Sequence, residues 1–269
     1  MTSPAQHTRR AVVTGAFALA AGSALSLVPA GRAHAAAAAA AGPEIVSCAG
    51  WGARAASEAV VVLANRPERI IVHHTATLNV TDYSQQRAYA LARAIQTYHM
   101  DAQGWIDTGQ HFTVSRGAFV TEGRHNSLAE LRTGKRQVRA AHCVGQNTVS
   151  IGIENEGTYM TEEPPAAQFA ALADLCAHIC TQYGLPASEI YGHRDFNSTS
   201  CPGDRLYALL PTLRKQVAIR LGTPLTDPQT DPIQDLIHEA TTHALSPFPE
   251  YLPERLLRQV VSSKSPAGG

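Results

Sequence analysis

Apolar and polar positions alternate along the middle of the chain in a way that predicts both strands and helices. Residues 69–74 read Arg-Ile-Ile-Val-His-His, a short apolar run that is typical of a buried strand. Residues 148–154 alternate and predict a second strand, and residues 190–193 predict a third. Residues 110–114 and 118–121 flank the turn 115–117, so we expect a hairpin in which Gly117 has a positive φ.

Three helices are expected between these strands. The first follows an N-cap at Thr81 or Asp82 and has apolar positions up to residue 98. The second begins at Pro165 and ends before Gly184, and the third runs from Leu206 to about residue 221. Since strands and helices are interleaved around a hairpin, we expect an α/β fold with a central mixed β-sheet flanked by helices.

The first 35 residues have the pattern of an export signal. Arg9 and Arg10 precede a moderately apolar, Gly- and Ala-rich stretch, and residues 33–35 form a small-x-small cleavage pattern. The arginine pair resembles a twin-arginine signal, and an ordinary secretory signal is the alternative. Both predict a protein secreted to the extracellular side, where disulfides are stable.

Composition divides the rest of the chain into three parts. Residues 36–47 are predicted to be a low-complexity leader and residues 48–221 a single folded domain. Residues 222–269 are predicted to be a proline-containing linker and a short helical tail, to which we assign no chemistry. After residue 35 no apolar run reaches the ~20 residues of a membrane span, so none is expected once the signal is removed.

The charge balance excludes some classes of function. The 269 residues contain 22 basic and 22 acidic side chains. Residues 1–35 hold three arginines and no acid, so their removal leaves a net charge of about −3. This balance excludes a strongly basic nucleic-acid-binding protein and an acidic disordered chain.

Histidine and cysteine spacing points to a metal. His193 and Cys201 are eight residues apart across a turn-rich segment, and imidazole nitrogen and thiolate sulfur are good zinc ligands. His73 or His74 offers a third ligand, but adjacent strand residues face opposite ways, so only one of them can join the site. Three protein ligands leave a fourth position for water, which is the catalytic pattern.

Five motifs in order give the chain a specific resemblance. Over about residues 48–220 it resembles the family of type-2 N-acetylmuramoyl-L-alanine amidases and peptidoglycan recognition proteins. The resemblance implies a central sheet with packed helices, Zn²⁺ in a surface cleft, and hydrolysis of the amide between N-acetylmuramic acid and L-alanine. The motifs are Ile70–Ala76, His99–Gly109, Ala141–His142, Ser150–Glu154 and Gly192–Gly203.

The resemblance also implies roles for single residues. His73, not His74, matches the first zinc ligand, His193 the second and Cys201 the third. Relatives that bind peptidoglycan without cutting it typically lack this cysteine, so an enzyme is expected. His142 matches a position in the substrate cleft, where it either contacts substrate or forms a structural hydrogen bond.

The chain departs from the family at one position. Many members have a transition-state-stabilising tyrosine where this chain has Gln110. Gln110 cannot transfer a proton but can donate a hydrogen bond to an oxyanion, so we expect it among the substrate-binding residues with His142. Residues 150–157 instead resemble the anhydro-muropeptide amidase branch, in which the glutamate matching Glu154 is the general base. Glu156 is the alternative base, since alternation puts it on the same face. Thr199 matches a Lys or Thr of the relatives, and its hydroxyl could hydrogen-bond the oxyanion.

The expected partner is peptidoglycan or its muropeptide fragments, bound by a monomer. Three alternatives stay open. The chain could be a non-catalytic peptidoglycan-binding module, or a thiol hydrolase that uses Cys143 or Cys201 beside a histidine. A third is a partner role for residues 222–269.

The other four cysteines, Cys48, Cys143, Cys176 and Cys180, allow three disulfide pairings. Cys176 and Cys180 lie one turn apart on a helix, so we expect each to pair with Cys48 or Cys143.

Overall fold

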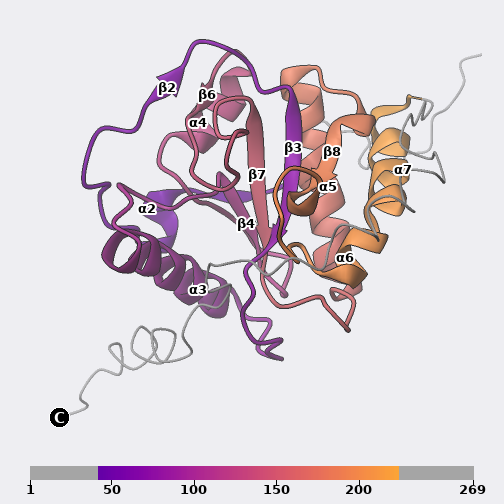
Figure 1. Cartoon of the computed structure of the whole chain (residues 1–269), viewed down its shortest axis with the longest axis horizontal. Coiled ribbons are helices and arrows are strands. Elements are labelled where there is room, and N and C mark those ends of the chain that lie inside the picture. The colour runs from indigo at the N-terminus through magenta and orange to yellow at the C-terminus, as the bar shows by residue number, and fades with distance from the viewer. Residues whose placement is uncertain (1–41, 224–269) are drawn as a thin grey trace, which may run out of the picture. The chain divides into compact units, whose positions relative to one another are not determined.

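The computed structural model describes residues 42–223 (Figure 1). The expected export signal, the first part of the leader and nearly all of the tail lie outside the described residues. None of the helices formed by residues 42–223 is both long and apolar enough to cross a membrane.

The central element is a six-stranded mixed sheet with the strand order β1-β5-β4-β7-β3-β8. Only β4 and β5 pair antiparallel, as the predicted hairpin, and the other neighbours are parallel. A separate antiparallel pair is formed by β2 and β6. The strands are β1 (Ile45–Val46), β2 (Val62–Leu63), β3 (Arg69–His74), β4 (Phe112–Val114), β5 (Val120–Glu122), β6 (Gln137–Val138), β7 (Ser150–Asn155) and β8 (Ile190–Gly192).

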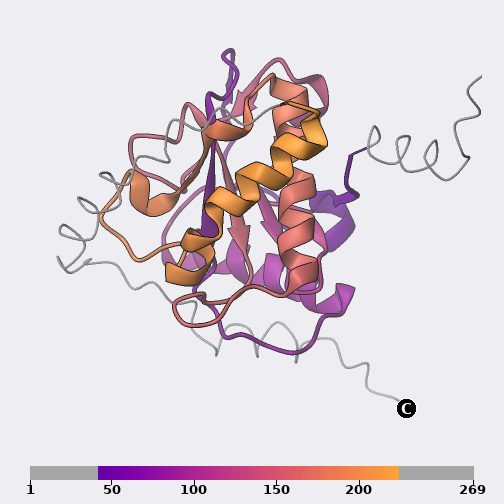
Figure 2. The same ribbon diagram turned by 90° about the vertical axis from the view of Figure 1, so that its right-hand side faces the viewer.

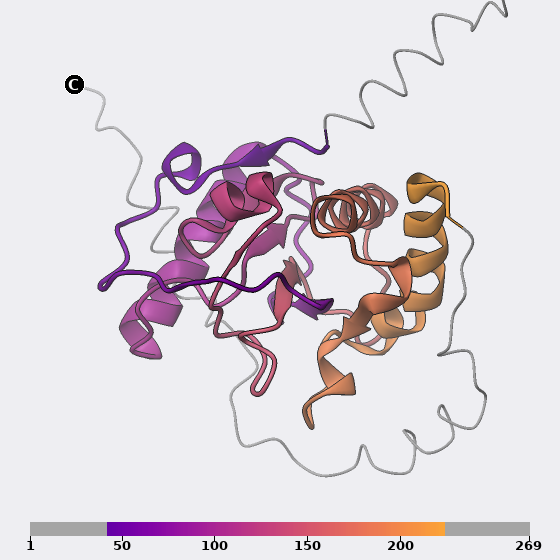
Figure 3. The same ribbon diagram turned by 90° about the horizontal axis from the view of Figure 1, so that it is seen from above.

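Helices cover both sides of this sheet. Figure 2 shows α7 beside α5, and Figure 3 shows α3 across the sheet from that pair. The helices are α2 (Cys48–Trp51), α3 (Gln85–Thr97), α4 (Ser127–Thr133), α5 (Ala166–Tyr183), α6 (Asp204–Ala208) and α7 (Leu210–Leu221), with the helical turns η1 (Tyr98–Ala102), η2 (Ala187–Glu189) and η3 (His193–Asp195).

The main core lies between the sheet and the helices α5 and α7. Ile70 and Val72 of β3 are fully buried in this core. Because strand side chains alternate, Ile71 and His73 lie on the opposite face. In the parallel register His73 is paired with Glu154, which in turn is paired with Thr113. The side chains of these three residues therefore form one row on the face turned away from α5 and α7.

Most predicted elements are confirmed, with local corrections. The first helix is capped by Ser84, whose hydroxyl accepts a hydrogen bond from Arg87, and not by Thr81 or Asp82. In the hairpin the positive φ is at Ala118, with a value of 68°. The third helix is broken at residue 209 into α6 and α7.

Gly117 is needed in the hairpin for a different reason from the predicted one. A Cβ there would lie 2.1 Å from the carbonyl oxygen of Tyr83. The glycine therefore allows a close approach of two backbone segments.

The strand β1 lies inside the segment predicted to be a leader. Ile45 and Val46 pair in parallel with Val120 and Thr121 of β5. A two-residue strand has too little periodicity to be recognised in the sequence. The ordered fold therefore begins before residue 48.

The expected disulfides are absent, because none of Cys48, Cys143, Cys176 and Cys180 forms a disulfide bond. Cys176 and Cys180 are residues of α5 that are buried in the main core, whereas Cys48 packs in a separate cluster with Trp51. The thiol of Cys48 donates to the carbonyl of Gly123 at 3.2 Å. The helix face that carries Cys176 and Cys180 is thus used for core packing.

Buried polar contacts brace the segment 105–109. The carboxylate of Asp107 is fully buried and accepts hydrogen bonds from Gln96 and His125. Nδ1 of His99 accepts from the backbone N–H of Gly109 at 3.0 Å, and its ring packs on Trp105. Burial, with a contribution from the charge of a nearby arginine, lowers the pKa of His99 from 6.5 to about 3.

Acid should therefore destabilise the native protein more than the His99→Asn protein, whose Oδ1 takes the place of Nδ1 and can still accept the Gly109 hydrogen bond. The unfolded chain takes up a proton at His99 near pH 6.5, while the folded protein stays neutral there until about pH 3. Between about pH 7.5 and pH 5, the difference in unfolding free energy between the two proteins should change by about 2 kcal/mol. Urea unfolding of both proteins in a chelator measures this difference as a function of pH. Identical pH dependences of the two proteins would contradict the lowered pKa of His99.

Candidate metal centre

Two of the predicted ligands are brought together by neighbouring parallel strands. His73 lies near the end of β3, and His193 follows directly after β8. The strands are in register through Val72 and Gly192, so the two histidines lie at the same carboxyl edge of the sheet. Their ring centroids are 4.5 Å apart. Carboxyl ends of strands are the usual place for ligands in open α/β sheets.

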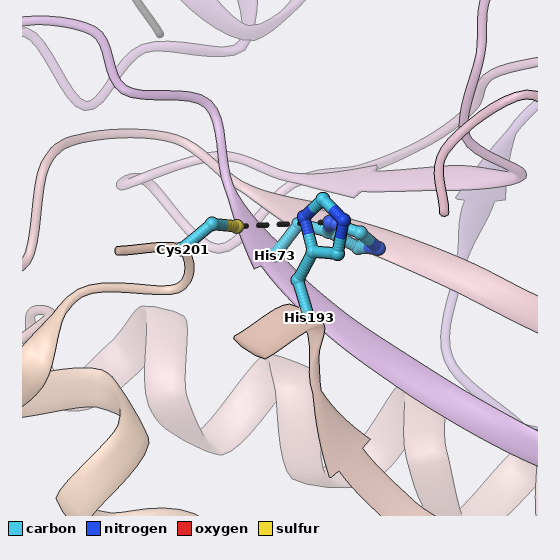
Figure 4. A group of neighbouring side chains, drawn as sticks. All are labelled: His73, His193 and Cys201. Carbon is cyan, nitrogen blue, oxygen red and sulfur yellow. Dashed lines mark hydrogen bonds between the residues drawn. The ribbon is translucent and has the colours of Figure 1, made fainter. Parts of the chain in front are cut away.

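Cys201 reaches the same point from the loop before α6. Its carbonyl accepts a hydrogen bond from the backbone N–H of Arg194, and its own N–H donates to Oγ1 of Thr199 at 3.2 Å. Sγ of Cys201 lies 3.6 Å from Nδ1 of His73 (Figure 4). The candidate ligand atoms of His73, His193 and Cys201 all lie within 4.8 Å of one another.

The donor set fits zinc. Zn–N bonds of about 2.05 Å and a Zn–S bond of about 2.3 Å at tetrahedral angles put nitrogen and sulfur about 3.6 Å apart. The observed distance between Nδ1 of His73 and Sγ of Cys201 is 3.6 Å. Burial lowers the pKa of His73 well below its ordinary value, as do the neighbouring histidines His193 and His142. The imidazole is therefore held neutral, which is the form that binds a metal.

His74 lies outside this group of donors. It follows His73 in β3 and so occupies the opposite face of the strand. Nδ1 of the His74 ring accepts a hydrogen bond from the backbone N–H of Tyr159 at 3.4 Å, and the backbone N–H of His74 donates to Sγ of Cys201. The side chain that joins the cluster is thus that of His73.

Glu154 is the carboxylate beside the cluster. It is paired with His73 in the register of β3 and β7 and is half-buried. Burial raises the pKa of Glu154 from 4.5 to about 8. Within residues 42–223 its carboxylate makes no hydrogen bond or ion pair, so no protein group competes for it.

Glu156, the alternative base, is held in the protein interior by partners of its own. Its side chain is fully buried and forms an ion pair with Nε of Arg87 at 2.8 Å. The other carboxylate oxygen accepts the backbone N–H of Arg116 at 2.9 Å. Both oxygens of Glu156 are therefore occupied by the scaffold.

Thr199 lies next to a candidate ligand, whereas the side chain of Gln110 is buried and contacts Thr113. The hydroxyl oxygen of Thr199 accepts the N–H of Cys201, which keeps Thr199 next to the ligand. Gln110 is only 1% exposed, and its Nε2 donates to Oγ1 of Thr113 at 2.8 Å. Thr113 is the register neighbour of Glu154. Gln110 is therefore connected to the row of His73, Glu154 and Thr113 by its hydrogen bond to Thr113, and its side chain lies below the surface.

His142 lies against the cluster on the same sheet face. Its Nδ1 is 2.9 Å from Nε2 of His73, so it is a hydrogen-bond partner of a candidate ligand. Its ring covers Gly152, where a Cβ would lie 2.4 Å from Cγ of His142. A glycine at this position therefore makes room for the imidazole.

Replacing Gly152 by alanine should destabilise the protein. The added methyl group must displace the His142 ring or the β7 backbone, and overpacking of this kind costs about 1–3 kcal/mol. Urea unfolding of the metal-free Gly152→Ala protein measures the loss. The control is Val144→Ala, whose side chain is 79% exposed and whose unfolding free energy should stay within about 0.5 kcal/mol of the native value. An unchanged midpoint for Gly152→Ala would show that the ring does not need this space.

Sequence reasoning missed Asn197. Its Oδ1 lies 3.0 Å from Nε2 of His193 and also accepts the backbone N–H of Val144 and the thiol of Cys143. Its position four residues after His193 is the only signal in the sequence, and asparagines are common in such turns. Cys143, an alternative nucleophile, is buried, and burial raises the pKa of its thiol to about 12, so it is an inert thiol at neutral pH.

Comparison with known proteins identifies the family. Residues 63–204 match the family model described as N-acetylmuramoyl-L-alanine amidase. The chain belongs to this amidase family. The peptidoglycan-recognition protein SC2 of Drosophila melanogaster is 33% identical over 169 residues, which cover 62% of this chain and 84% of the relative. Human N-acetylmuramoyl-L-alanine amidase is 35% identical over 147 residues, 53% of this chain and 23% of the human protein.

A solved structure of the family confirms the expected fold, a central mixed sheet flanked by helices. It contains tracheal cytotoxin bound to the ectodomain complex of peptidoglycan recognition proteins LCa and LCx. The similarity has a TM-score of 0.55 at 30% identity and covers 62% of this chain and 95% of the other. The amidase family thus contains relatives named as recognition proteins as well as relatives named as amidases.

Proposed function

We propose that this protein is a zinc-dependent N-acetylmuramoyl-L-alanine amidase. Its substrate is the amide bond between N-acetylmuramic acid and the L-alanine of the stem peptide, in peptidoglycan or its muropeptide fragments. The observation that carries the proposal is the convergence of two imidazoles and one thiol, His73, His193 and Cys201, at the carboxyl edge of the sheet. A binding module needs no such set of donors, whereas a hydrolytic metal site does.

The residues around the metal have separate roles in this reaction. His73, His193 and Cys201 hold zinc, which when bound supplies a Lewis acid for the amide carbonyl and the attacking water. Glu154, in the same row as His73, takes the proton of the attacking water and passes it to the leaving nitrogen. Thr199, held beside Cys201, donates its hydroxyl to the developing oxyanion. Gln110 supports this row through Thr113.

The organisation of the whole chain is part of the proposal. Residues 1–35 act as an export signal, of the twin-arginine class by its arginine pair, and deliver a secreted protein. The amidase domain, predicted as residues 48–221 and extended at its start by β1 (Ile45–Val46), works as a monomer, and residues 222–269 form the linker and tail. Sequencing the N-terminus of the secreted protein tests the cleavage after residue 35.

The test is the identity of the products. Peptidoglycan and purified muropeptides are digested with the full chain, and the fragments are analysed by mass spectrometry. Free peptides that begin with L-alanine, together with sugar that carries an intact lactyl group, are expected. Binding of muropeptides without any such products would favour the second candidate, a recognition protein, which the names of several relatives support.

A further inference from the structure

A chain of hydrogen bonds behind His73 determines where its proton lies. The hydroxyl of Ser150 donates to the carbonyl oxygen of Gln146 at 2.8 Å, because a carbonyl can only accept. Oγ of Ser150 is then an acceptor for Nε2 of His142, which lies 3.4 Å away. With its proton on Nε2, His142 presents an acceptor at Nδ1.

The tautomer of His142 in turn determines the tautomer of the candidate ligand His73. Nδ1 of His142 lies 2.9 Å from Nε2 of His73, so Nε2 of His73 must be the donor. A neutral imidazole has one N–H, so the lone pair of His73 is on Nδ1. Nδ1 is the atom that lies 3.6 Å from Sγ of Cys201.

An independent contact, with Asn197, determines the tautomer of the second histidine ligand, His193. Oδ1 of Asn197 accepts the backbone N–H of Val144 at 3.1 Å, and its Nδ2 donates to the carbonyls of Val144 and Phe196. A backbone N–H can only donate, so the amide orientation of Asn197 is determined. Nε2 of His193 lies 3.0 Å from this Oδ1 and must carry the proton. The lone pair of His193 is therefore also on Nδ1.

We infer that His142 and Asn197 are positioning residues that hold both histidine ligands in the tautomer whose Nδ1 binds the metal. This inference rests on the proposed zinc site. His142 orients His73, and Asn197 orients His193. Both depend on one loop, because His142 belongs to residues 141–147 and Asn197 is held by Val144 of the same loop. Partners of this kind fix the ring orientation and raise the basicity of the ligand.

Metal affinity is the first readout. Competition with a chromophoric chelator gives the Zn²⁺ affinity of the full chain and its variants. His142→Ala and Asn197→Ala should each weaken binding by about 10–100-fold. His142→Asn and Asn197→Asp keep an acceptor oxygen in place and should restore most of the affinity. Val144→Ala changes only an exposed side chain of the loop and should bind like the native protein.

The tautomers themselves are the second readout, and it needs no metal. Long-range ¹H–¹⁵N correlation spectra of the metal-free chain distinguish Nε2–H from Nδ1–H imidazoles. His73 and His193 should both be in the Nε2–H form. His142→Ala should release His73 into a mixture of tautomers, and Asn197→Ala should do the same for His193. Urea unfolding of the metal-free variants identifies any that fail to fold.

The outcomes separate the two proposals. If the native chain binds Zn²⁺ and the alanine variants bind it equally well, the positioning roles are wrong and the proposed function stands. An Nδ1–H form of either ring in the metal-free protein also overturns the inference. If the native chain binds no Zn²⁺, the proposed function fails, and the tautomer spectra still decide whether His142 and Asn197 set the protons of their partners.

Discussion

Release of stem peptides by the Cys201→Ser protein is expected to be at least about 10³-fold slower than by the native protein, a loss equivalent to several kcal/mol of transition-state stabilisation. Cys201 is the one thiol in the cluster, and its Sγ lies at the distance from Nδ1 of His73 that a shared zinc ion requires. A serine hydroxyl does not ionise at neutral pH and is a poor zinc ligand. Mass-spectrometric rates, with zinc content measured on the same samples, test this loss.

Removal of the metal should reproduce this defect in the native protein. A chelator is expected to abolish peptide release, and added Zn²⁺ should restore it. Cys180→Ala is the matched control for loss of a thiol, because Cys180 is a core residue of α5 and its variant should keep its activity. Activity that survives the chelator but is lost on alkylation would instead support a thiol hydrolase.

Glu154→Gln is expected to lower kcat by about 10²–10⁴-fold, the usual contribution of a general base. Glutamine fills the same space in the row beside His73 but cannot take the proton of the attacking water. Since Glu154 is not among the three candidate ligands, the variant should still bind one zinc ion. Steady-state rates on a muropeptide, with zinc stoichiometry and urea unfolding, separate loss of the base from loss of the metal or the fold.

Glu156→Gln provides the contrast two residues away. It removes a charge from the buried ion pair with Arg87, and breaking such a pair costs about 3–5 kcal/mol of stability. The protein that remains folded should keep its turnover rate. A full rate in Glu154→Gln, together with a lost rate in folded Glu156→Gln, would move the base to Glu156.

The parts of the fold that the sequence predicts are those with a strong local signal. β3 is predicted with its observed bounds, because three apolar residues, Ile70 to Val72, follow one another and two histidines end the run. α5 is predicted from Pro165 to Gly184, because both ends carry turn residues typical of helix termini. β1 and β6 have two residues each, so their existence depends on partners elsewhere in the chain.

The candidate site, too, has residues that the sequence predicts and others that depend on the tertiary structure. The order of the family motifs is enough to select His73, His193 and Cys201. The alternation of residues along the strand, taken alone, does not distinguish His73 from His74. The choice depends on which face of β3 is covered by α5 and α7, and that is a tertiary fact. The structural role of Glu156 likewise depends on Arg87 of α3, which lies 69 residues earlier in the chain and forms an ion pair with it. Local alternation of residues could not show that this carboxylate has a partner.

The pairing of β1 with β5 sets a limit on how far the N-terminus can be trimmed. A protein cut back to residue 48, where the sequence pattern places the start of the domain, would lack Ile45 and Val46. β5 would then become the outer strand of the sheet, with the backbone groups around Val120 and Thr121 open to another chain. Uncovered outer strands of this kind promote aggregation, so a protein shortened at its N-terminus should begin no later than residue 44.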